Sequence, residues 1–209
     1  MEQSINPDGL FSILVIVGVV VASLTLIGLI FAKLYTRATK EIAFVRTGLG
    51  GEKVIKDGGA LVLPVVHEII PVNMNTLRIE VEKVQKDALI TKDRMRVDVK
   101  ADFYLRVAPN VNGISMAAQT LGTRTTRVEE VKKLMESKFV DVLRAVAAEM
   151  SMTEMHEQRA DFVQKVQQSE ANDLEKKGLE IESVSLTGFD QTDIKIIKEN
   201  NALDDEGRA

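Results

Sequence analysis

One uncharged apolar run near the start of the chain limits what this protein can fold into. Residues 10–32, LFSILVIVGVVVASLTLIGLIFA, contain no Asp, Glu, Lys or Arg. As an α-helix, this run would be roughly 35 Å long, slightly more than the ~30 Å hydrocarbon core of a bilayer. A cleaved signal peptide would need basic residues before the run and a small-residue cleavage site after it, and the sequence offers neither. We therefore expect a retained transmembrane helix at residues 10–32.

The charges on either side of this run predict its orientation. Residues 1–9 contain no Lys or Arg, whereas the segment after the run contains Lys33, Arg37, Lys40 and Arg46. By the positive-inside rule, residues 1–9 form a short extracytoplasmic N-terminus and the rest of the chain lies in the cytoplasm. Gly18 and Ala22 have the small-xxx-small spacing that lets helices approach closely, and they are our candidate positions for transmembrane packing.

Composition excludes several classes of function for the rest of the chain. Of the 209 residues, 45% are hydrophobic and 28% charged, with a net charge of −4, so a core can form and no basic excess points to nucleic acid. Aromatic residues make up only 4%, without tryptophan, which argues against a platform for stacking bases. The absence of cysteine excludes disulfides, thiolate metal sites and thiol nucleophiles.

Alternating apolar and polar residues dominate the segment from about residue 41 to 107. The clearest case is residues 94–107, where one predicted face is apolar and the other is polar. The apolar face has Val97, Val99, Ala101, Phe103, Leu105 and Val107. The polar face has Arg96, Asp98, Lys100, Asp102, Tyr104 and Arg106. We expect a β-rich subdomain at residues 33–108, in which Pro64 and Pro71 restrict their segments to edges or bulges.

The period changes to helical spacing after Pro109. We expect helices at residues 111–121 and 126–150, and a further helix that starts after Thr153 as its N-cap. Gly178 is placed to end that helix, and a strand follows at residues 179–188 with a bulge where its phase slips. These elements form a predicted α/β subdomain at residues 109–190, and residues 191–209 begin a connection to a later segment.

A glycine-rich stretch at residues 46–59, RTGLGGEKVIKDGG, is the one candidate for a phosphate-binding loop. A P-loop needs Gly-Lys followed by Ser or Thr, and then a helix whose N-terminal amides complete the cradle. Here Lys53 is followed by valine, and the residues after it have strand character. We therefore expect Gly48, Gly50 and Gly51 to supply the positive φ angles of a hairpin turn.

No other residue combination predicts a catalytic site. The two histidines, His67 and His156, are far apart in the sequence, and each is expected at the surface. Asp98 and Asp102 resemble a carboxylate pair, but they alternate with basic residues, so a salt-bridged face is the better interpretation. We expect no enzyme activity, no cofactor and no metal.

Several stretches resemble the SPFH family, which includes stomatins, prohibitins, flotillins and the HflK/HflC pair. They are the run LITKDRMRVDVKADFYLRV at residues 89–107, GGALVLPVVHEIIPVNM at residues 58–74, and FVDVLRAVAAEMSMTEMHEQRADF at residues 139–162. The run at residues 48–69 and the final NNALDDEG are similar to bacterial inner-membrane flotillins. The resemblance covers residues 40–207. It implies an α+β fold with a β-rich and an α/β subdomain (an SPFH, band 7 or PHB domain), and a coiled coil beyond residue 209.

The resemblance also implies a function. Members of this family form large homo-oligomeric rings or cages on membranes, so we expect a scaffold that organises a membrane microdomain, its lipids and its proteins in the bacterial inner membrane. A small NfeD-like membrane protein is an expected partner. In such a ring, charged residues of the 94–107 strand are candidate oligomer contacts, namely Arg96, Asp98, Lys100, Asp102 and Arg106. Because its apolar face would be untouched, reversing Asp98 and Asp102 to lysine is expected to leave the subunit folded.

Two alternatives stay open at this point. A ring of the same architecture could control access to a membrane protease, as HflK/HflC-type members do. A membrane-anchored nucleotide enzyme that uses Gly48 to Lys53 belongs to a different class, and ATP binding would distinguish it from both kinds of ring.

Overall fold

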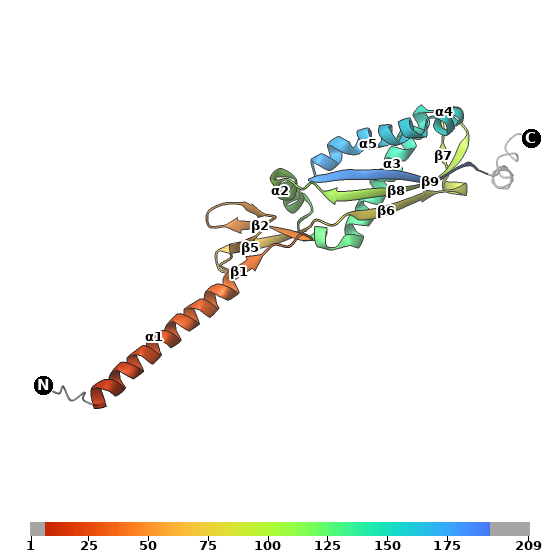
Figure 1. Ribbon diagram of the computed structural model, residues 1–209. Helices are drawn as coiled ribbons and strands as arrows, with labels where there is room; N and C mark the ends of the chain where they lie inside the picture. The colour runs from red at the N-terminus through yellow and green to blue at the C-terminus, as the bar shows by residue number, and fades with distance from the viewer. Residues whose placement is uncertain (1–6, 193–209) are drawn as a thin grey trace, which may run out of the picture.

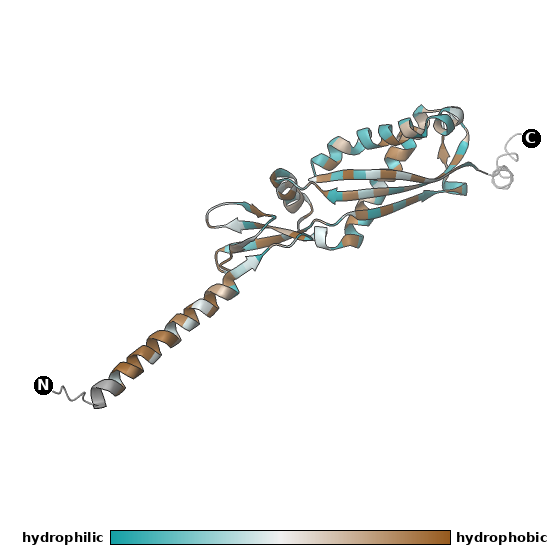
Figure 2. Cartoon of the chain, viewed as in Figure 1, coloured by the Kyte–Doolittle hydropathy of each residue, from teal (hydrophilic) through white to brown (hydrophobic). Residues whose placement is uncertain are grey.

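A single helix projects from the folded part of the molecule. The computed structural model describes residues 7–192, and α1 (Pro7–Leu34) extends away from all the other elements (Figure 1). Its side chains from Phe11 to Lys33 are exposed, and its surface is apolar along nearly its whole length (Figure 2). Within the described residues, it is the one helix long and apolar enough to cross a membrane. The predicted helix at residues 10–32 is therefore confirmed as a helix.

Two small sheets follow directly on α1. β1 (Tyr35–Arg37) pairs with β4 (Gly59–Leu61), and β2 (Ile42–Gly48) lies between β3 (Lys53–Ile55) and β5 (His67–Asn73). All of these pairings are antiparallel. β5 contains Pro71 and is an edge strand, as the sequence predicts. A small core lies beneath these strands and consists of Ala38, Phe44, Ile55 and Val62.

The main sheet is built around one long central strand, β8 (Arg96–Val107). On one side β8 pairs with β6 (Leu77–Lys83) and the short β7 (Leu89–Ile90), and on the other side with β9 (Leu179–Gln191). The 3-10 helix η1 (Gln85–Asp87) connects β6 to β7. The predicted alternation is confirmed, because one face of β8 is at most 4% exposed at every position. These positions are Val97, Val99, Ala101, Phe103, Leu105 and Val107.

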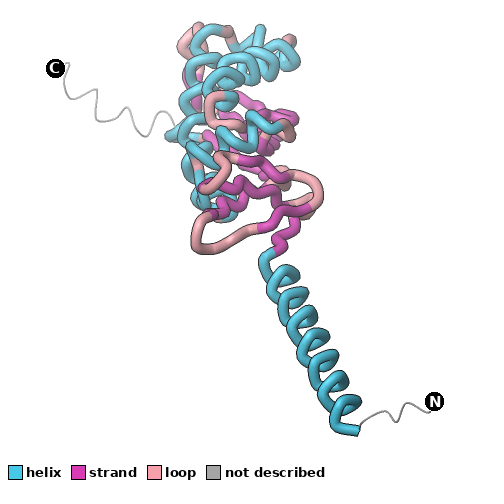
Figure 3. Tube along the Cα trace, turned by 90° about the vertical axis from the view of Figure 1, so that its left-hand side faces the viewer, coloured by secondary structure: helices cyan, strands magenta, loops and turns pink. Residues whose placement is uncertain are grey.

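Helices cover this apolar face and leave the other face open (Figure 3). α2 (Val111–Thr120) and the 3-10 helix η2 (Gly122–Thr126) lead into α3 (Val128–Glu149), and α4 (Met152–Glu157) leads into α5 (Arg159–Glu175). Phe103 of β8 stacks on Phe139 of α3, with ring centroids 4.0 Å apart. Ala43, Val45 and Val72 of the three-stranded sheet belong to the same core as the main sheet, and the small core under β1 to β5 is a separate cluster.

The structure corrects the predicted start of the last helical segment. Thr153 is not the N-cap; Ser151 is, and it forms a capping box with Glu154. The segment is also two helices, because Gln158 has φ −115° and ψ 48° and interrupts the helical hydrogen bonds. The serine followed three residues later by glutamate is the usual signature of a capping box, so the sequence contained this signal.

β9 contains two bulges, of which the sequence predicted one. Glu182 is the extra residue between two register pairs, in agreement with the predicted phase slip, and Thr187 is a second extra residue. β9 belongs to the predicted second subdomain and β8 to the first, yet the two strands pair from Val97 to Val107. The predicted division at residue 108 therefore falls between strands that share one sheet. The expected connection covers residues 191–209; Gln191 is the last residue of β9, and residues 193–209 lie outside the described residues.

Candidate membrane and assembly surfaces

The junction between α1 and the small sheets is tightly hydrogen-bonded. The amide of Val62 donates to the carbonyl oxygen of Leu34 at 2.7 Å, and Tyr35 pairs with Leu61 in the β1–β4 ladder. The chain thus enters the folded domain without a free linker. The loop that follows Val62 is held beside the C-terminal end of α1.

Two loops expose large apolar side chains at this end of the molecule, and we call them the apolar tip. They are the β2–β3 loop with Leu49 and the β4–β5 loop with Leu63, Val65 and Val66. Leu49 is 71% exposed and Val65 is 95% exposed. The amide of Leu49 donates to the carbonyl oxygen of Val66 at 3.1 Å, so the two loops lie side by side.

His67 holds these two loops together. Its Nδ1 accepts a hydrogen bond from the amide of Leu63 at 3.2 Å, so Nε2 carries the proton and donates to the carbonyl oxygen of Leu49 at 3.0 Å. The sequence predicted a surface histidine; the His67 side chain is half-buried at the surface, and its two hydrogen bonds give it a structural role that the sequence did not indicate. His156 is exposed, as expected.

The glycine stretch forms the predicted hairpin turn. Gly48, Gly50 and Gly51 have φ of 117°, 89° and 81°, and β3 follows them where a P-loop would need a helix. The hairpin is tied to α2, because Glu52 accepts hydrogen bonds from Ser115 and Gln119. These contacts explain the loop as a structural connection. They provide no phosphate cradle.

The open face of the main sheet carries the predicted oligomer contacts, and each of them already has a partner within the chain. Lys100 lies 2.5 Å from Glu82, and Arg106 lies 2.6 Å from Glu180. Arg96 donates to the carbonyl oxygen of Lys86 at 3.4 Å. This face is therefore a set of internal ion pairs exposed to solvent, and its contact with a second subunit stays a prediction.

Asp98 and Asp102 accept hydrogen bonds that connect β8 to neighbouring segments. Asp102 is only 4% exposed and accepts a hydrogen bond from Arg78 at 2.9 Å, which raises the pKa of that guanidinium. Asp98 accepts from the amide of Gln85 at 2.8 Å and from the hydroxyl of Thr192 at 2.6 Å. These contacts argue against the expectation that both can be reversed without harm to the fold, because lysine at position 98 would face the buried Thr192 and lysine at position 102 would place a cation in a buried position beside Arg78.

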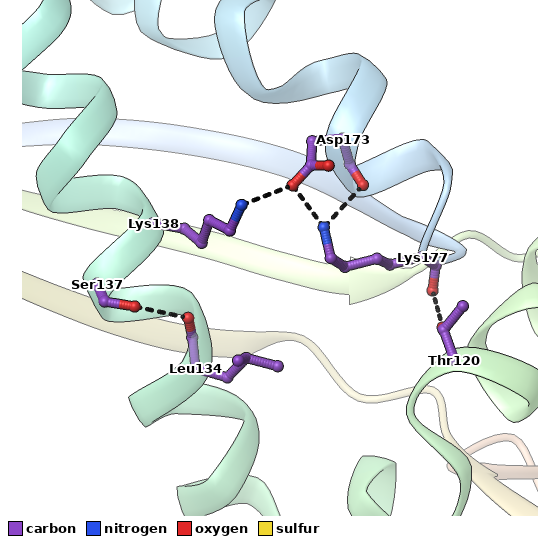
Figure 4. A network of polar contacts seen from close by, with 6 residues as sticks. All are labelled: Thr120, Leu134, Ser137, Lys138, Asp173 and Lys177. Atoms are coloured by element: carbon purple, nitrogen blue, oxygen red, sulfur yellow. Dashed lines mark hydrogen bonds and ion pairs between the residues drawn. The ribbon is translucent and has the colours of Figure 1, made fainter.

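A buried carboxyl that the sequence analysis missed lies between α3 and α5. Glu170 is 8% exposed, and its Oε2 has no hydrogen-bond partner among the described residues. Nearby, Asp173 joins Lys138 at 3.3 Å to Lys177 at 2.5 Å (Figure 4). Burial, and then the charge of Asp173, raises the pKa of Glu170. The spacing Phe162, Val166, Glu170, Leu174 places this glutamate in the apolar stripe, so the signal was present.

A groove of about 920 Å³ opens between α2, α5 and the start of β9. Its lining includes Val111 and Met116 of α2, Glu175 of α5, and Glu180 and Glu182 of β9. No lysine or arginine is among its lining residues. The sequence alone gave no sign of this groove, because it joins three segments that are distant along the chain.

The described residues also bear on two predictions, the absence of a metal site and the packing positions on α1. Between residues 7 and 192, no group of three or more His, Asp or Glu side chains is arranged to hold a metal ion. Gly18 and Ala22 lie on the exposed surface of α1, and no atom lies within 4 Å of a Cβ built on Gly18. Their role in helix packing stays a prediction.

Comparison with known proteins agrees with the fold. Residues 37–202 match the SPFH domain / Band 7 family, and the chain belongs to this family. α1 and the similarity to inner-membrane proteins described next fit a membrane-anchored protein.

Three relatives carry flotillin names. The chain is 54% identical over 209 residues to the flotillin family inner membrane protein YqiK of Escherichia coli (strain K12), covering 99% of this chain and 37% of the relative. It is 31% identical over 202 residues to the flotillin family inner membrane protein sll1021 of Synechocystis, covering 95% of this chain and 30% of the relative. It is 26% identical over 189 residues to the flotillin-like protein FloT of Bacillus subtilis, covering 83% of this chain and 36% of the relative. The chain thus spans about a third of the length of these relatives.

Proposed function

We propose that this protein is a flotillin-like membrane scaffold that assembles into a large homo-oligomeric ring or cage and organises the lipids and proteins of the membrane patch it encloses. The family membership and the flotillin names of the relatives support this class of function. One structural observation carries it further: the hydrogen bond between Val62 and Leu34 joins the folded domain directly to the membrane helix. A domain held in this way cannot swing freely, so neighbouring copies would meet in a fixed orientation.

The charge distribution supports one topology for this scaffold. The basic residues at the C-terminal end of α1 and directly after it, Lys33, Arg37 and Lys40, would face the anionic cytoplasmic leaflet. The SPFH domain would then lie in the cytoplasm and the N-terminus outside the inner membrane. We include a small NfeD-like membrane protein as the proposed partner.

Electron microscopy of the protein extracted from membranes in a mild detergent tests the proposal. We expect closed particles of many subunits of uniform size. Monomers or dimers in both detergent and native membranes would contradict a scaffold of this kind. Mass spectrometry of the co-purifying proteins then separates two purposes of a ring, since a membrane protease in place of an NfeD-like protein would indicate control of proteolysis.

A further inference from the structure

We propose that the groove between α2, α5 and β9 is one half of the lateral contact between subunits, and that it receives the η2–α3 edge of a second copy of this chain. We call the first surface the acidic groove and the second the basic edge. The basic edge is defined by four residues of η2 and the start of α3, together with the exposed Leu134 beside them: Arg124, Arg127, Lys132 and Lys133. This inference rests on the proposed homo-oligomeric scaffold and names the surfaces that would build it.

The acidic groove has an unbalanced charge. Among its three glutamates, Glu180 lies 2.6 Å and Glu182 3.9 Å from Arg106 of the neighbouring strand. Glu175 is exposed and forms no ion pair with any residue between 7 and 192. The groove therefore offers at least one carboxylate without a basic partner, beside apolar side chains that remain exposed. These are Val111, which is 56% exposed, and Met116, which is 37% exposed.

The basic edge has the opposite imbalance. Three of its four cations are in ion pairs, because Lys132 lies 3.3 Å from Glu129, while Arg127 lies 3.0 Å and Arg124 4.0 Å from the same Glu130. Glu80 and Glu136 also line a hollow with Lys132 and Lys133. Lys133 is exposed and forms no ion pair in the described part of the chain. Next to it, Leu134 is 42% exposed at the rim of a hollow of about 390 Å³ that Leu121 and Val131 also line. The basic edge is thus opposite in charge to the acidic groove, and both surfaces expose apolar side chains.

The two surfaces lie at opposite edges of the main sheet. β9 pairs with one side of β8, and its first residues line the acidic groove. β6 pairs with the other side of β8, and its residues Arg78 and Glu80 line a hollow together with Lys132 and Lys133. Repeating the subunit sideways along the sheet therefore brings the groove of one copy to the basic edge of the next. Such a head-to-tail contact repeats from copy to copy and can close into a ring, whereas a two-fold contact through the groove would bring two acidic grooves together.

The segment that follows the described residues is a poorer occupant of the groove. It begins after Thr192, at the end of β9 away from Glu180, and the intervening strand is roughly 35 Å long. Residues 193–209 contain five acidic and three basic side chains, a net charge of −2, so they would be repelled by the carboxylates of the groove. The charge of the groove favours the basic edge.

Cysteine cross-linking tests this contact directly, because these 209 residues contain no cysteine and any cysteine elsewhere in the full-length protein can be replaced by serine. Glu175→Cys and Lys133→Cys would be introduced together in the full-length protein and treated in native membranes with a short bis-maleimide. We expect a ladder of cross-linked dimers, trimers and larger species. Each single variant should give no ladder, since a head-to-tail contact never brings the same residue of two copies together. Lys133→Cys with Glu157→Cys at the end of α4 is the matched control and should also give none.

The results of cross-linking and electron microscopy together distinguish a failure of this contact from a failure of the proposed scaffold function. Large particles by electron microscopy without a cross-linked ladder from the Glu175→Cys, Lys133→Cys double variant would overturn this contact and leave the scaffold intact. The absence of large particles from the cysteine-free protein would overturn both. Dimers formed by Glu175→Cys alone would show a two-fold contact and also overturn the proposal.

Charge reversal provides a second measurement of the same contact. Glu175→Lys should reduce the fraction of protein in large particles at least several-fold, because it places a cation against the basic edge. Adding Lys133→Glu to the same chain should restore that fraction. A double variant as poor as the single would contradict the pairing.

Discussion

The amide of Val62 donates a 2.7 Å hydrogen bond to the carbonyl oxygen of Leu34, the last residue of α1. With α1 across a bilayer, the apolar tip would therefore lie at the level where the chain leaves the membrane, and its exposed valines would have a surface to enter. We expect a fluorophore attached at Val65→Cys to be quenched by brominated lipids in vesicles. The same fluorophore at Glu157→Cys, at the far end of the helical layer, should not be quenched. Equal quenching at both positions, or none at either, would contradict this placement.

The second prediction concerns topology. A single cysteine at Glu157 should be protected from a membrane-impermeant maleimide in cells with a permeabilised outer membrane, because the basic flank after α1 holds the domain inside. A cysteine at Ser4 should be labelled under the same conditions. Lysis should make both accessible. Labelling of Glu157→Cys without lysis would reverse the orientation and place the assembly on the other side of the membrane.

The third prediction compares two glycines of the hairpin turn. A Cβ on Gly48 would lie 2.0 Å from the carbonyl oxygen of Val66, whereas a Cβ on Gly50 meets no atom within 4 Å. Both residues have positive φ. Gly50→Ala should therefore cost about 1–2 kcal/mol from backbone strain alone, and Gly48→Ala should cost more because the backbone must move. Thermal unfolding in detergent measures this order, and equal midpoints would contradict it.

The same hairpin also bears on nucleotide binding. Lys53 is the first residue of β3, and the glycine loop before it leads into this strand and not into a helix N-terminus. We expect neither the native protein nor Lys53→Ala to bind ATP in equilibrium dialysis. ATP binding that depends on Lys53 would revive the enzyme hypothesis.

The fourth prediction uses the buried Glu170. Its pKa is raised by burial, so the folded state retains this proton to a higher pH than the unfolded state does. The free energy of unfolding therefore falls as the pH rises through the window between the two pKa values. Glu170→Gln should raise the unfolding midpoint at pH 7, by roughly 2–4 °C if the gain is about 1 kcal/mol, and should change it little at pH 4. A destabilised variant at pH 7 would show that the carboxylate is needed.

The fifth prediction tests the charged sheet face as an oligomer contact. Glu80 and Glu82 lie on this face with exposed side chains, so Glu80→Lys with Glu82→Lys should leave the subunit folded, since exposed pairs contribute at most ~1 kcal/mol each. If the face meets another subunit, the native mass should shift to smaller species, most clearly at low salt. Glu149→Lys with Glu157→Lys makes the same charge change on the helical side as a control. Native mass unchanged at every ionic strength would mean that the face is only solvated.

Local patterns predicted the elements of this fold well. The alternation at residues 94–107 identified both faces of β8, because a half-buried strand imposes period two on its side chains. The positive φ angles of Gly48, Gly50 and Gly51 followed from turn chemistry, since the lack of a helix after them excluded a P-loop.

Features that depend on distant segments could not be predicted in the same way. The bond between Arg78 and Asp102 crosses from β6 to β8, and the groove around Glu175 joins α2, α5 and β9. Such contacts need the register and the packing of the helices, which periodicity does not contain. The split at Gln158 was missed for a different reason: the apolar stripe continues across it, so its spacing hides the break.

The direction of β9 determines how far the end of the main sheet lies from α1. Its first residue, Leu179, lies near α2 and the small sheets, and the strand ends at the opposite end of the molecule from α1 (Figure 1). Thirteen residues of strand extend roughly 40 Å, and pairing with β8 holds the strand extended in spite of its two bulges. The main sheet therefore determines how far from α1 the segment after Thr192 begins in the full-length protein. A change in this distance would require both β8 and β9 to be longer, so the distance is a property of the whole domain.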